Sequence, residues 1–137
     1  MKPEDDPDFQ PGFRFSGFDA TILIVGALTA IGVAIFWLPL AAVVVAFVVG
    51  HFFLFCNVFR IARAPELIWA AAFFGLATWA MLSTRPVFAW SLAFGLSLAI
   101  AAILIALETR KPSYHGVGWQ RFNPGLKDWW NRVRSGN

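Results

Sequence analysis

Charged residues make up only 14% of this 137-residue chain, whereas 58% of its residues are hydrophobic and 17% are aromatic. Soluble domains carry roughly 25% charged residues, so the composition excludes an ordinary soluble domain and is typical of an integral membrane protein. The net charge of +3 comes from cations beside apolar segments, which favours anionic lipid headgroups over nucleic acid as partners.

Residues 1–19 form an acidic, proline-containing segment that also carries several phenylalanines, among them Phe13 and Phe15. A secretory signal needs a basic start and a small-residue cleavage site, and this segment has neither. We therefore expect a cytoplasmic tail and a first apolar segment that stays in place as an anchor. The aromatic side chains are expected to pack on the membrane interface or on another subunit.

A run of 40 residues, Ala20–Phe59, contains no Lys, Arg, Asp or Glu. One helix of that length would reach roughly 60 Å, about twice the hydrocarbon core of a bilayer. The run therefore predicts two membrane-spanning helices that fold back on each other at residues 37–40, with Pro39 in the turn.

The sequence predicts an all-α integral membrane protein with four transmembrane helices in two hairpins, within residues 20–108. Pro65 and Pro86 mark helix boundaries in the later part of the chain, because proline suits the start of a helix and breaks its interior. The predicted spans are Ala20–Trp37, Ala41–Ala62, Leu67–Ser83 and Val87–Leu107.

The distribution of Lys and Arg predicts the orientation of the four spans. One side of the membrane, with both termini and the second loop, would carry ten cations, and the other side only Arg85. Because cytoplasmic loops are rich in Lys and Arg, both termini are expected in the cytoplasm, with the chain in the cell (inner) membrane.

Small residues and tryptophans suggest how the helices pack. Two rows have small-xxx-small spacing, Gly26-Ala30-Ala34 in the first span and Ser91-Gly95-Ala99 in the fourth. Such rows are expected to face other helices, within one bundle or between copies of the chain. Trp69 falls near a span end, where an interfacial anchor keeps its indole N–H in contact with water.

The C-terminal tail, residues 109–137, contains a short amphipathic helix. Asn123 is expected to cap it and Pro124 to occupy its first position. Leu126, Trp129 and Trp130 would share one face, with cations around them. The helix is expected to lie in the cytoplasmic interface and to contact lipid; docking to a protein partner uses the same pattern.

His51 is the one ionisable residue near the middle of a predicted span. A polar group at that depth is costly and is by default a candidate for function, such as a proton relay, a pore lining or a cofactor ligand. The structural alternative is a neutral imidazole that is hydrogen-bonded to Thr29 or Ser97. No metal site is expected, because the only other histidine lies in the tail.

A polar cluster follows at the cytoplasmic end of the same helix. Cys56, Arg60 and Arg63 fall within about 60° on a helical wheel, and Asn57 adjoins them. Arginine offers a planar fork of donors, so Asn57, Arg60 and Arg63 could bind a phosphate or carboxylate headgroup. Alternatively, both arginines act only as positive-inside anchors, and Glu66 or Glu108 neutralises one of them.

No pairing of nucleophile and base, no carboxylate pair and no phosphate-binding glycine loop occurs in the sequence, so an enzyme is not predicted. We expect a non-catalytic accessory or scaffold subunit of a larger membrane complex. Its partners would be membrane lipids and other membrane subunits or copies of itself. The alternative is a small homo-oligomeric transporter or channel that uses His51. The sequence identifies no cofactor.

Overall fold

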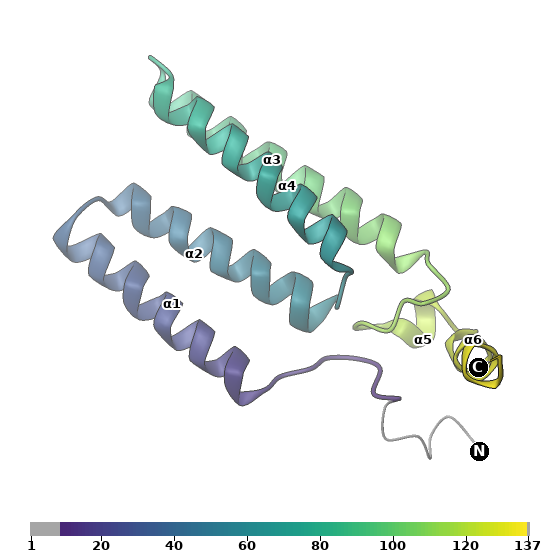
Figure 1. Ribbon diagram of the computed structural model, residues 1–137. Coiled ribbons are helices and arrows are strands. Elements are labelled where there is room, and N and C mark those ends of the chain that lie inside the picture. The colour runs from purple at the N-terminus through teal and green to yellow at the C-terminus, as the bar shows by residue number, and fades with distance from the viewer. Residues whose placement is uncertain (1–8, 137) are drawn as a thin grey trace. The chain divides into compact units, whose positions relative to one another are not determined.

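The computed structural model describes residues 9–136, and this part of the chain consists of helices and loops without a strand. Four helical segments are long and apolar enough to cross a membrane, which confirms the predicted all-helical architecture. They are α1 (Gly17–Phe36), the continuous segment Pro39–Val58, α3 (Arg63–Leu82) and α4 (Pro86–Thr109) (Figure 1).

The second segment consists of α2 (Pro39–Phe53) and a π-helical turn, Leu54–Val58. Two helices follow α4 in the tail, α5 (Trp119–Phe122) and α6 (Leu126–Ser135). The chain divides into two compact units. Of the described residues, 9–60 and 115–119 belong to the first unit, and 61–114 and 120–136 to the second.

In the first unit, α1 and α2 run antiparallel (Figure 1). A capping box begins α1: Ser16 Oγ accepts a hydrogen bond from the Asp19 N–H, and the Asp19 carboxylate accepts one from the Ser16 N–H. This box satisfies two N–H groups that a helix start leaves open, so α1 begins three residues before the predicted Ala20. Pro39 is the first residue of α2 and not part of the turn, because its missing N–H costs nothing there.

Gly26 sets how closely the two helices of this hairpin approach. A Cβ atom added to Gly26 would lie 2.9 Å from both Cγ atoms of Val49. Glycine therefore allows a contact between α1 and α2 that any larger residue would push apart, as the predicted small-residue row in the first span implies.

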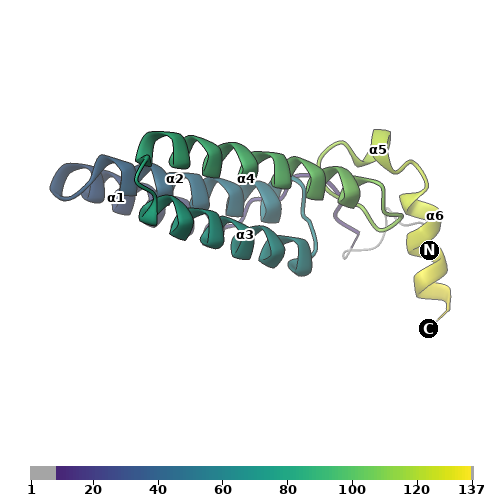
Figure 2. The ribbon, with the colours of Figure 1, turned by 90° about the horizontal axis from the view of Figure 1, so that it is seen from above.

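In the second unit, α3 and α4 lie side by side (Figure 2). The helix α3 begins at Arg63, before the predicted Leu67, and Pro65 lies in its first turn, where it interrupts no hydrogen bond. In contrast, the second span ends at Val58 and not at the predicted Ala62.

The buried row of small residues on α4 is not the predicted one. Ser91, Gly95 and Ala99 are exposed, whereas the row two positions away is buried: Ala89, Ala93, Ser97 and Ala101. Both rows have the same spacing, so the spacing alone could not distinguish them. The Trp69 indole N–H donates to the Ser97 carbonyl at 3.0 Å and thereby marks the row that faces α3.

Trp69 is therefore not an interfacial anchor as predicted. Its side chain is buried, and its ring stacks on Phe73 with the centroids 5.5 Å apart. The Ser97 carbonyl takes the place of the water that the prediction assigned to the indole N–H.

The amphipathic tail helix is present as α6, but Gly125 and not Asn123 is its N-cap residue. The Asn123 side-chain amide instead donates to the carbonyls of Pro112 and Tyr114, at 2.6 and 3.0 Å. These bonds close the turn between α4 and the tail helices, and they use the donor side of the amide.

The contact at Gly26 predicts that the same substitution destabilises the protein more at Gly26 than at Gly32 of α1. Gly26→Leu is expected to lower the free energy of unfolding by about 1–3 kcal/mol, because the β-branched Val49 cannot rotate away. Gly32→Leu is the matched control, since a Cβ at Gly32 meets nothing within 4 Å. Denaturant unfolding in detergent micelles measures both, and equal losses would contradict the proposed close contact.

Candidate functional site

A π-helical turn ends the second segment and places its polar residues. The Phe59 N–H donates to the Leu54 carbonyl at 2.9 Å, five residues back. Arg60 then adopts a left-handed backbone with φ of 49°, a conformation that costs an L residue about 1 kcal/mol or more. Turns of this kind occur frequently at functional sites, and this one turns the chain out of the helix directly after Asn57 and Val58.

Three chain segments meet at this turn, and we call them the clasp: residues 10–16, residues 54–60 and residues 115–119. Backbone and side-chain hydrogen bonds join them. Arg14 and Asn57 exchange two: the Arg14 N–H donates to the Asn57 carbonyl at 3.2 Å, and Asn57 Nδ2 donates to the Arg14 carbonyl at 3.0 Å. The Gly12 N–H donates to the His115 carbonyl at 2.7 Å, and the Val117 N–H donates to the Val58 carbonyl at 2.8 Å.

Asn57 is the buried centre of the clasp, with only 2% of its surface exposed. Its Nδ2 group is fixed by the Arg14 carbonyl, which determines the orientation of the amide. Among residues 9–136, Asn57 Oδ1 has no hydrogen-bond partner. A buried acceptor without a donor is rare in folded proteins, so this oxygen marks a place where a further group belongs.

Arg60 follows Asn57 by three residues and is half-buried, and its guanidinium group donates to the Gln10 carbonyl. Burial, and secondly the charge of Arg14, lowers the pKa of the Arg60 guanidinium. The structure thus adds Arg14 to the predicted cluster. Sequence reasoning missed this residue because Arg14 precedes Asn57 by 43 positions, and no local spacing relates the two.

The predicted cluster has two further members, Arg63 and Cys56. Arg63 belongs to the second unit, where its exposed side chain forms an ion pair with Glu66 at 3.1 Å. The predicted neutralisation of one arginine by Glu66 is therefore confirmed. Cys56 is half-buried in the π-helical turn. Of the three predicted headgroup-binding residues, the clasp contains Asn57 and Arg60.

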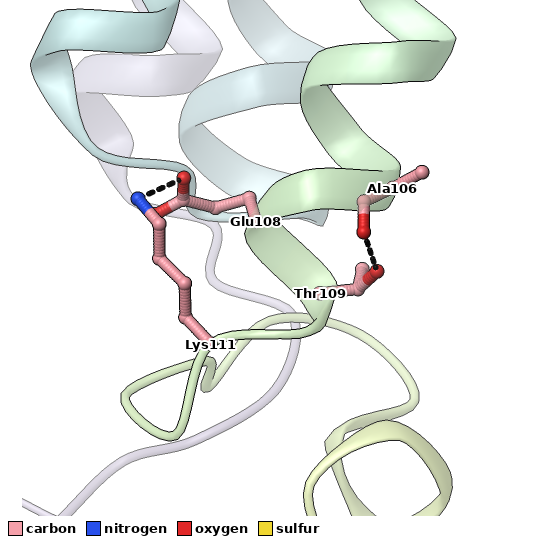
Figure 3. A network of polar contacts seen from close by, with 4 residues as sticks. All are labelled: Ala106, Glu108, Thr109 and Lys111. Carbon is pink, nitrogen blue, oxygen red and sulfur yellow. Dashed lines mark hydrogen bonds and ion pairs between the residues drawn. The ribbon is translucent and has the colours of Figure 1, made fainter.

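Glu108, the other acid considered as an arginine partner, pairs with a lysine instead. Its carboxylate lies 2.7 Å from the Lys111 Nζ atom, just past the end of α4 (Figure 3). The next residue, Thr109, donates to the Ala106 carbonyl at 3.0 Å (Figure 3). These contacts close the last turn of α4.

His51 is buried near the middle of the second segment and makes a contact within its own helix. Its Nδ1 atom lies 2.9 Å from the Phe47 carbonyl oxygen, which requires the ring proton on Nδ1. The centroids of the Phe47 and Phe55 rings lie 4.2 and 5.9 Å from that of the imidazole. The hydroxyls of Thr29 and Ser97, the predicted partners, donate to carbonyls of their own helices.

The tail helix α6 carries the second predicted contact surface. Trp129 and Trp130 are half-buried and adjacent, with ring centroids 6.5 Å apart, and Leu126 is buried. The Arg134 guanidinium lies 5.7 Å from the centre of the Trp130 ring, within the range of a cation–π contact. The surface thus combines aromatic rings with positive charge.

Within residues 9–136, no group of three or more His, Cys, Asp or Glu side chains is placed to hold a metal ion. Comparison of the chain with protein-family models, with curated proteins and with solved structures finds no match.

The reciprocal bonds of Asn57 predict a local change in dynamics. Asn57→Leu is expected to speed hydrogen exchange at the Gly12 and Arg14 amides by roughly 5- to 30-fold, because a lost hydrogen bond costs about 1–2 kcal/mol. Exchange in α4 should stay unchanged. Hydrogen–deuterium exchange mass spectrometry measures both regions, with the exposed substitution Asn131→Leu as control. Unchanged exchange at residues 12–14 would argue against the clasp.

Proposed function

We propose that the chain is a non-catalytic accessory subunit of a larger complex in the cell (inner) membrane. The strongest support comes from the hydroxyl groups of three of the apolar segments, α1, α3 and α4. Each donates to a backbone carbonyl three or four residues back in its own helix: Thr21, Thr29, Thr78, Ser91, Ser97 and Thr109. Transport pathways need polar groups aligned between helices, whereas these groups are satisfied within single helices.

The exposure of α1 also favours a role in assembly. None of its residues is buried, and large apolar side chains such as Leu28, Ile31 and Ile35 are 56–69% exposed. Lipid, another protein or another part of this chain must cover this surface. Outside the apolar segments, Phe13 and Phe15 are 56% and 52% exposed, and such aromatic side chains are enriched at protein interfaces.

This proposal predicts co-purification with partner proteins. Isolation of the tagged chain in mild detergent, followed by native mass spectrometry, is expected to give a complex with other membrane subunits in fixed ratio. Phe13→Ala with Phe15→Ala should weaken that association, while Phe122→Ala, at a position equally exposed in the tail, should leave it intact. Recovery of the wild-type chain as a lone monomer would contradict the accessory role.

The alternative function, a small transporter or channel, is supported by the buried position of His51. The two functions differ in what His51→Ala does. An accessory subunit is expected to keep its assembly and to give no flux in proteoliposomes, with or without the histidine. Flux by the wild-type chain that His51→Ala abolishes, with assembly intact, would favour the transporter.

We further propose that both termini lie in the cytoplasm, as the ratio of ten cations to one supports. The four candidate spans are even in number, so the two termini share a side if all four insert. A reporter that is active only in the cytoplasm is expected to work when fused after Asn137 and to fail when inserted at Thr84. The reverse pattern would refute this orientation.

A further inference from the structure

Neither guanidinium group of the clasp forms an ion pair within residues 9–136, in contrast to Arg63 and Lys111. The carboxylate whose charge acts on Arg14 is that of Asp19, and this carboxylate already accepts hydrogen bonds from Ser16 at the start of α1. Arg60 is half-buried, and the charge of Arg14 is near enough to lower the pKa of its guanidinium. Arg14 is exposed, so only Arg60 is partly withdrawn from water. The repulsion between the two like charges is unfavourable, and a bound anion would offset it.

The C-terminal carbonyls of the second segment do not need the two arginine side chains as hydrogen-bond donors. Carbonyls at a helix C-terminus often attract arginine side chains, but backbone N–H groups already occupy them here. The Asn57 carbonyl accepts from the Arg14 N–H, and the Val58 carbonyl accepts from the Val117 N–H. A guanidinium group has five N–H donors in a planar fork, and the Gln10 carbonyl takes up only part of that capacity in Arg60.

The arginines call for an acceptor, whereas Asn57 Oδ1 calls for a hydrogen-bond donor. This buried acceptor has no partner within residues 9–136, and the bond from Nδ2 to the Arg14 carbonyl prevents the amide from turning over. A ligand that satisfies the whole site must therefore present an anion to the arginines and a hydrogen-bond donor to the asparagine.

We infer that Arg14, Asn57 and Arg60 form a binding site for a phospholipid headgroup that combines a phosphodiester with a hydrogen-bond donor. The phosphate oxygens accept from the guanidinium groups, and a headgroup hydroxyl or ammonium donates to Asn57 Oδ1. The second candidate span ends at Val58, so the site lies at the depth of the lipid phosphates once that span is in a bilayer. Phosphatidylglycerol meets both requirements, whereas phosphatidylcholine has no donor.

The test measures lipid retention by the full-length chain. The protein is reconstituted into nanodiscs with equal amounts of phosphatidylglycerol and phosphatidylcholine, extracted in mild detergent and examined by native mass spectrometry. Wild-type protein is expected to retain phosphatidylglycerol over phosphatidylcholine by about tenfold, the effect of one charge-assisted hydrogen bond. Arg14→Gln with Arg60→Gln should abolish the preference.

Two further variants separate the site from general electrostatics and from misfolding. Arg110→Gln with Arg121→Gln removes the same charge from exposed positions outside the clasp and should keep the preference within about twofold. Arg14→Lys with Arg60→Lys keeps the charge but loses the planar forks, and an intermediate preference is expected.

Three results would overturn the inference: no preference in the wild-type chain, equal loss in both glutamine double variants, or displacement of the lipid by excess inorganic phosphate. The inference depends on membrane insertion, which is part of the proposed function, but not on the accessory role. Resistance to alkaline carbonate extraction tests insertion separately. A chain that inserts but shows no lipid preference contradicts the headgroup site alone.

Discussion

The hydroxyl groups and the imidazole inside the apolar helices find hydrogen-bond partners in their own helix, and much of the structure depends on that constraint; the Trp69 indole, which donates to Ser97 of α4, does not follow it. The serine and threonine hydroxyls of α1, α3 and α4 donate back to their own backbones, and in the second segment His51 contacts the Phe47 carbonyl of its own helix. The helix surfaces are therefore apolar nearly throughout. Close packing of small residues must then hold each hairpin, as at Gly26 and along the buried row of α4.

Hydrogen bonds between distant segments consequently gather where the helices end. The clasp is the main example, since the π-helical turn and the left-handed Arg60 release the carbonyls of Asn57 and Val58 from the helical pattern. Backbone groups of two other segments take them up. Backbone N–H groups, rather than arginine side chains, thus satisfy these two carbonyls. Arg60 lies at the same helix end, where its guanidinium group donates to the Gln10 carbonyl.

The sequence was sufficient for features that depend on composition and length, and insufficient for those that depend on contacts between distant residues. Four apolar helices follow from runs of uncharged residues of the required length. The sequence spacing could not choose between two equivalent small-residue rows on α4, and the partner of the Trp69 indole lies 28 positions away. In the candidate site, Asn57 and Arg60 are neighbours on one helix end and were identified. Arg14 joins them only through a tertiary contact, which no periodicity encodes.

The clasp also sets an order of events during biosynthesis. Its third segment, residues 115–119, follows the whole of α3 and α4 in the chain, although it belongs to the first unit. A ribosome that adds 5–20 residues per second needs roughly 3–11 s to proceed from Arg60 to His115. Throughout that interval the Val58 carbonyl and the Gly12 N–H of the first hairpin lack their partners, the Val117 N–H and the His115 carbonyl. The clasp can therefore form only after the second hairpin has been synthesised. In a chain that is truncated before residue 115, the Val58 carbonyl lacks its partner, and this helix end stays accessible to cellular quality control.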